Sequence, residues 1–255
     1  MVKQIFKKEG WTIIKSNLCK ADKKGFTLAE VLITLAIIGV VAAMSMPTLL
    51  ANVQKAIAIT QIKRTFAILS NTTYMAEADY GAASGWEMKN GNTRDGAKFF
   101  AERYIIPYVR TAKICTDNNN ADCDYTIRGL NNATINMYKN QTYRFYLVDG
   151  SFVILWANQN MGSSGHRKQV TIYFDINSKK GANSVGHDVF KLEYILNSGT
   201  KPKQYVGKIL PAYVEYNRDT LLTARNEGCH KNKEGIACLA VIYNDGWVFA
   251  KDYPW

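Results

Sequence analysis

The sequence has few of the residues that enzymes use for acid–base or metal chemistry. Only three histidines occur in 255 residues, and none has the spacing of a metal site or an obvious nucleophile partner; they are His166, His187 and His230. A glycine-rich phosphate loop and a carboxylate pair suited to acid–base work are also missing from the sequence. We therefore expect a protein that is not an enzyme and that needs no cofactor.

Acidic residues are scarce as well, and the excess of positive charge is unevenly placed. The formal net charge is +11; residues 1–25 hold seven lysines against two acidic residues, a net +5, which leaves +6 for the remainder. Lysines just before an apolar run predict that the N-terminus stays in the cytoplasm and the C-terminal body is exported. No basic cluster interleaved with aromatic residues indicates a nucleic-acid interface.

A long apolar run follows these lysines, and it contains a single charge. The 21 residues from Phe26 to Met46 include one ionisable side chain, Glu30. A run of about 20 apolar residues is long enough to span a bilayer as a helix, and a charge within it is costly unless it is paired. Cleavage between Gly25 and Phe26 would create an ammonium one helical turn from Glu30. The two opposite charges can then pair within one chain or between neighbouring chains.

The stretch from residue 23 to 32 reads Lys-Lys-Gly-Phe-Thr-Leu-Ala-Glu-Val-Leu, and it resembles the prepilin cleavage and methylation signal of type IV pilins and type II secretion pseudopilins. The resemblance implies that prepilin peptidase cuts between Gly25 and Phe26 and that Phe26 is N-methylated. It also implies that Glu30 acts in assembly with other pilin or pseudopilin subunits. A secretory signal peptide ending near Ala42-Ala43, or a plain signal anchor, is an alternative that does not explain the Gly-Phe junction with Glu30.

An amphipathic pattern continues the helix beyond the apolar run. Its predicted buried face recurs at steps of three and four residues: Ile59, Ile62, Phe66, Leu69, Thr73, Ala76 and Tyr80. We predict one helix from about 27 to 80, kinked at Pro47 because proline removes a backbone hydrogen bond. The predicted domains are a leader (1–25), a membrane or filament-core helix (26–46), the second half of the helix (47–80) and a globular domain (81–255).

The globular domain shows a short helix pattern followed by strand patterns. A helix is predicted at about 94–105, and polar loops are predicted at 111–133 and 158–168. The predicted strands are 145–148 and 151–156, joined by Asp149-Gly150, then 170–176, 189–196, and a last hairpin of 236–243 and 247–251. This order predicts an α+β fold in which an antiparallel sheet packs on the second half of the long helix, a layout that pilins and pseudopilins share.

Four of the five cysteines lie beyond the leader, in two close pairs: Cys115 with Cys123, and Cys229 with Cys238. An even number of cysteines in short loops of an exported domain predicts disulfides. Three connectivities are possible, and we favour the two local ones. A zinc site made by all four cysteines is the alternative, although paired ligands in such sites usually lie closer in sequence.

Residues 174–188 are rich in oxygen-bearing side chains. Because some pseudopilins hold calcium in a loop of the C-terminal region, the resemblance makes Asp175, Asn177 and Asp188 candidate calcium ligands. Calcium prefers six to eight oxygen ligands, whereas this segment offers two carboxylates interrupted by two lysines. A simple Asn/Gly turn between strands is the interpretation we favour.

The resemblance implies a structural protein of the bacterial inner membrane that is later built into a periplasmic or cell-surface filament. Its partners would be prepilin peptidase, other subunits and membrane lipid. The leading hypothesis is a pseudopilin of a type II secretion system. A type IV or competence (minor) pilin is the alternative, acting in adhesion, motility or DNA uptake, and only this alternative makes DNA a partner. A membrane-anchored exported enzyme is a third hypothesis, disfavoured because an active-site pattern is missing.

Overall fold

The computed structural model describes residues 25–115, 123, 126–137, 139–160, 167–178, 180–197 and 202–255. The chain divides into two units, one up to Leu50 and one from Ala51 to Trp255. The longest element, helix α1 (Leu28–Tyr80), contributes its first part to the first unit and its second part to the second. All other described helices and strands belong to the second unit.

Six strands of the second unit form one antiparallel sheet in the order β1-β4-β5-β6-β7-β8, and β2 pairs with β3 separately. The strands are β1 (Thr111–Cys115), β2 (Ile127–Arg128), β3 (Thr134–Ile135), β4 (Tyr143–Leu147), β5 (Phe152–Asn160), β6 (Arg167–Asp175), β7 (Val189–Ile195) and β8 (Ile209–Pro211). The described part of the unit also contains three shorter α-helices: α2 (Arg94–Tyr104), α3 (Arg218–Thr223) and α4 (Cys238–Asn244).

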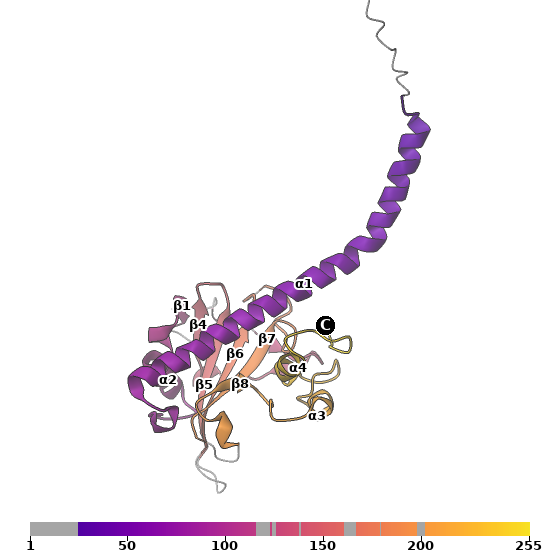
Figure 1. Ribbon diagram of the computed structural model, residues 1–255. Helices are drawn as coiled ribbons and strands as arrows, with labels where there is room; N and C mark the ends of the chain where they lie inside the picture. Colours follow the sequence, from indigo (N-terminus) through magenta and orange to yellow (C-terminus); the bar gives the residue numbers. More distant parts are fainter. Residues whose placement is uncertain are drawn as a thin grey trace, which may run out of the picture. The chain divides into compact units, whose positions relative to one another are not determined.

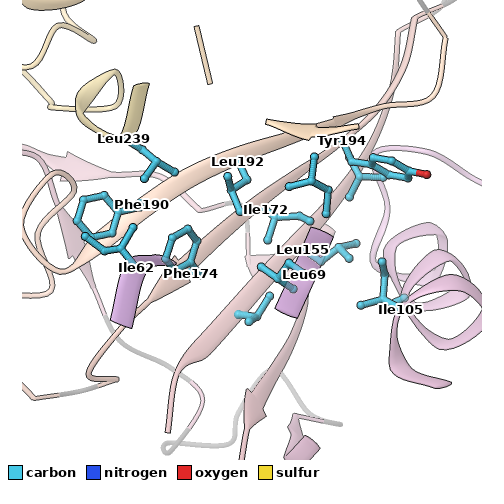
Figure 2. Packing of buried hydrophobic residues seen from close by; sticks show 14 of the residues in the cluster. Ile62, Leu69, Ile105, Leu155, Ile172, Phe174, Phe190, Leu192, Tyr194 and Leu239 are labelled. Carbon is cyan, nitrogen blue, oxygen red and sulfur yellow. The ribbon is translucent and has the colours of Figure 1, made fainter. Parts of the chain in front are cut away.

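The second half of α1 lies across one face of this sheet (Figure 1). Ile62 and Leu69 of α1 lie over Leu155, Ile172 and Phe174 of the central strands (Figure 2). An antiparallel sheet therefore packs on a long N-terminal helix, which confirms the predicted α+β, pilin-like fold.

The buried stripe of α1 agrees only in part with the predicted one. Its buried residues are Ala58, Ile62, Thr65, Leu69, Thr72, Thr73 and Ala76. Tyr80 was predicted on the buried face but is 44 % exposed; its ring contacts Tyr104 in an edge-to-face arrangement, with centroids 5.1 Å apart, and the Arg103 guanidinium, 5.2 Å from its centroid. Small residues let the helix approach the sheet closely, and inside this contact the Thr65 hydroxyl lies 3.1 Å from the Ser151 hydroxyl.

The opposite face of the sheet is also covered, which explains why Phe152-Val153-Ile154-Leu155 is apolar at every position. Successive side chains of a strand point to opposite faces. Val153 and Leu155 join the core beneath α1, whereas Phe152 and Ile154 join a second cluster. That second cluster is completed by buried residues from the sheet itself, Cys115 and Val189, and from loops and short elements: Cys123, Ile127, Val185, Ala212 and Ile236.

The predicted last hairpin is wrong. Residues 238–244 form helix α4, and no strand is found at 247–251. The run from Ala237 to Ile242 is buried throughout, and a short, fully buried apolar run is compatible with either a strand or a helix. Here the chain turns back after the helix: Trp247 donates its backbone N–H to the Ile242 carbonyl and adopts a positive φ of 66°.

Other elements were missed or predicted too short. The predicted loop 111–133 contains β1 and β2, and the predicted loop 158–168 is shortened because β5 continues to Asn160 and β6 begins at Arg167. Asn160 pairs with Arg167 at the end of the β5–β6 ladder. Backbone pairing therefore extends this hairpin into a segment whose sequence shows no alternation of apolar and polar residues. The helix at 94–105 and the hairpin around Asp149-Gly150 are confirmed as α2 and β4–β5.

The packing of α1 on the sheet predicts that Leu69 contributes strongly to stability. Leu69 is fully buried, so Leu69→Ala should lower the free energy of unfolding of the second unit by about 3 kcal/mol. Ile57→Ala is the matched control on the same helix; Ile57 is 52 % exposed, and its loss should be under about 1 kcal/mol. Guanidinium unfolding of the full chain in detergent, followed by tryptophan fluorescence, measures both. Equal losses would contradict this packing.

Candidate processing and assembly site

Glu30 and Thr27 hold the start of helix α1 by reciprocal hydrogen bonds. The Glu30 carboxylate accepts from the Thr27 backbone N–H at 2.8 Å and from the Thr27 hydroxyl at 2.9 Å. The Thr27 hydroxyl in turn accepts from the Glu30 backbone N–H at 3.2 Å. This is a capping box, in which two otherwise unpaired backbone donors of the first turn are satisfied. The helix therefore begins directly after the Gly25-Phe26 junction.

The role of Thr27 in this cap was not predicted. The signal is present in the sequence, because a threonine followed three residues later by a glutamate is typical of a helix start. The consequence is chemical as well as structural. In the uncleaved chain the Glu30 carboxylate already has two donors, although no cation lies near it among the described residues.

The Gly25-Phe26 junction is accessible, and the described fold does not require glycine there. Gly25 is exposed and Phe26 is 87 % exposed. A Cβ added to Gly25 would meet no atom within 4 Å, and the residue does not adopt the left-handed backbone conformation that favours glycine. The fold of this chain therefore does not explain the glycine. A processing enzyme that must approach the backbone closely would explain it, because any side chain at this position would crowd the enzyme.

The length and composition of the part of α1 in the first unit are consistent with a membrane-spanning helix. Its most apolar 18-residue window has a mean hydropathy of 2.3, none of it is buried, and the helix is long enough to cross a membrane. The hydroxyl groups of Thr34, Ser45 and Thr48 each donate to a carbonyl of the same helix at 2.9 Å. Polar groups that are satisfied within the helix are what a lipid environment requires.

Glu30 is the one ionisable side chain between Gly25 and Gln54. It lies in the first turn of α1, four residues after the predicted new N-terminus at Phe26, which precedes the helix. Helix α1 continues through Pro47, and the kink predicted there stays a prediction.

The four described cysteines form two disulfides. Cys115 is bonded to Cys123, and Cys229 is bonded to Cys238. These are the two local pairings, and they leave none of the four thiolates for zinc. In the part of the chain that the structure describes, no group of three or more metal-binding side chains comes together.

The candidate calcium ligands lie in a turn in which the two carboxylates accept hydrogen bonds from backbone N–H groups of the turn itself. Asp175 accepts from the Asn177 backbone N–H at 2.9 Å. Asp188 accepts from the backbone N–H groups of Asn183 at 2.9 Å and Ser184 at 2.5 Å. The amide oxygens of Asn177 and Asn183 are buried and have no hydrogen-bond partner among the residues that the structure describes. This geometry is that of a closed Asn/Gly turn, and calcium binding at Asp175, Asn177 and Asp188 stays a prediction.

The side chains of the two described histidines each contact a neighbouring residue of the fold. The ring of His187 stacks on Trp255, with centroids 4.5 Å apart. The Nδ1 atom of His230 accepts from the Asn232 backbone N–H at 3.3 Å. His166 lies outside the described residues.

Comparison with known families gives two matches that divide the chain near Pro47. Residues 20–46 match the prokaryotic N-terminal methylation motif, the signal that type IV pilins and pseudopilins carry. This match confirms the resemblance in the sequence and implies processing by a prepilin peptidase and assembly with other pilin subunits. A search of curated proteins and a search of solved structures return no match. Because residues 48–255, more than half of the chain, match the family described as Family of unknown function (DUF6613), the protein belongs to that family and carries the methylation motif in front of it.

Proposed function

We propose that this type IV pilin-like precursor is a structural subunit of a type II secretion pseudopilus. One observation carries the proposal: the sole charge of an apolar, membrane-length helix lies one turn from an exposed Gly-Phe junction. Cleavage there would remove residues 1–25 and leave the amine of Phe26 beside Glu30. N-methylation of Phe26 would keep this amine positively charged.

The pairing of these two groups would drive assembly. A carboxylate in apolar surroundings needs a cationic partner, and leaving one partner of such a pair alone costs about 3–5 kcal/mol. In a filament the Glu30 carboxylate would face the Phe26 amine of an adjoining subunit. The Thr27 cap supports this proposal, because its neutral donors hydrogen-bond the Glu30 carboxylate before the subunit meets the Phe26 amine of a neighbour.

Export of the body is supported by its covalent chemistry and by the charge of the leader. Disulfides persist in oxidising compartments, and both pairs lie in the second unit. The lysines before residue 25 would keep the leader in the cytoplasm. The first half of α1 would then cross the inner membrane, with the second unit on the far side.

A minor type IV or competence pilin is the second candidate, and the charge of +6 beyond residue 25 favours it. Deletion of the gene distinguishes the two. Loss of folded exoproteins from the medium, with motility, adhesion and DNA uptake unchanged, supports the pseudopilin. Normal secretion with loss of motility, adhesion or DNA uptake would assign the pilus instead.

Processing should depend on Gly25 and not on the fold. Gly25→Val places its side chain in open space, so the chain should fold normally, but the bulkier residue should block cleavage almost completely. Intact-mass measurement of the membrane-extracted protein detects whether residues 1–25 are removed. Gly39→Ala is the control, because a Cβ at Gly39 also meets no atom within 4 Å and the residue lies away from the junction. Normal removal of the leader from Gly25→Val would contradict the assigned cleavage site.

Assembly should depend on the charge of Glu30 and not on its capping bond. Glu30→Gln can still accept the Thr27 hydrogen bonds, because glutamine also serves in a capping box, whereas Glu30→Ala loses both cap and charge. We expect both variants to be cleaved and both to fail to enter filaments, measured by shearing and immunoblotting. If Glu30→Gln assembles as well as the wild type, capping explains Glu30 and the charge pairing is wrong.

A further inference from the structure

A hollow of about 440 Å³ opens at one end of the sheet, within the second unit. Three segments converge there because of the strand register: Thr111 of β1 lies opposite Leu147, Tyr146 of β4 opposite Phe152, and Phe152 of β5 opposite Asp175. The start of β1, the β4–β5 turn and the loop that follows β6 therefore form its walls. Neither the predicted processing site nor the calcium candidates line it.

The floor of the hollow is apolar. Val148 is 57 % exposed there, and Ala112 is exposed beside it. The ring of Tyr146 is half-buried and is held in place by Phe152, with ring centroids 4.6 Å apart. A volume of this size falls within the range of about 300–1,000 Å³ that is usual for ligand pockets, which are mostly lined by such side chains.

The rim of the hollow is basic. Lys113 of β1 and Lys180 of the loop after β6 line it, and none of the described residues that line it is acidic. Lys180 is exposed, and it forms no ion pair with any residue that the structure describes. Two lysines beside an apolar floor create a positive potential that attracts a carboxylate and repels cations.

We propose that this hollow binds an acidic, extended peptide segment of a partner protein. An apolar side chain of the segment would lie on the floor made by Ala112, Tyr146 and Val148, and its carboxylates would face Lys113 and Lys180. The hollow is open to solvent and borders β1, which pairs with β4 alone among the described strands. The register of β1 shifts between Thr111 and Lys113, so side chains, and not an added strand, carry the recognition.

The test uses the full chain in nanodiscs of neutral lipid and three short, end-blocked peptides. The first alternates glutamate with leucine; the second has lysine for glutamate, and the third has serine for leucine. We expect saturable binding of the glutamate–leucine peptide by calorimetry and at least tenfold weaker binding of the other two. Lys180→Glu should weaken binding of the first peptide about tenfold, and Val148→Thr several-fold. Lys203→Glu, an equal charge change before the opposite edge strand β8, should leave it within about twofold.

Several results would overturn the proposal. Equal binding by Lys180→Glu and the wild type, or equal binding of the lysine peptide, would rule out recognition of carboxylates at this rim. A lack of saturation up to about 1 mM peptide would mean that the hollow has no useful affinity for such segments. Binding of anionic vesicles that the peptide does not displace, in place of peptide binding, would assign the lysines to a lipid surface. Because both lysine substitutions are at exposed positions, circular dichroism can verify that the variants are folded.

Discussion

A single carboxylate in the apolar first part of a long helix is the constraint on which the rest of the N-terminal structure depends. Glu30 lies in the first turn of α1, and its carboxylate accepts two hydrogen bonds from Thr27. Both bonds are accepted by one oxygen, Oε2, and neutral donors of this kind do not neutralise the charge. A nearby amine would do so, and the proposed cleavage at the Gly25-Phe26 junction would create one. Cap, junction and proposed pairing therefore lie within six residues.

Helix α1 meets two different environments, and its composition changes accordingly. In the first unit apolar side chains are exposed all around the helix, as expected for contact with lipid or with other helices. From Ala58 onward only one stripe is buried, against the sheet. The two family matches divide the chain near the same point, since the methylation motif ends at residue 46 and the second family begins at residue 48. A general assembly helix is thus joined to a body particular to one family.

The spacing of apolar residues was sufficient to predict the helices and strands that bury one face. The second half of α1, helix α2 and the hairpin around Asp149-Gly150 follow from apolar spacing and turn residues alone. Where a segment is buried on every side, spacing carries little information, and the run from Ala237 to Ile242 was therefore predicted as a strand although it is a helix. The edge strand β1 was missed because its pairing with β4 comes from the tertiary fold and not from its own alternation.

The candidate site was largely readable from the sequence because it is local. Gly25, Phe26 and Glu30 lie within six consecutive residues, so no long-range contact had to be inferred. Only the cap by Thr27 was overlooked, although its spacing from Glu30 is a known helix-start pattern. The hollow near Val148 could not be predicted, because it joins β1, β4 and the loop after β6 through the register of the sheet.

The central claim is that the amine created at Phe26 pairs with Glu30 of a neighbouring subunit. A structure of the assembled filament at side-chain resolution measures this distance directly. The account predicts the Phe26 nitrogen within about 4 Å of a Glu30 carboxylate oxygen of an adjoining chain. A filament in which residues 1–25 are still attached, or in which Glu30 contacts only its own Thr27, would contradict it.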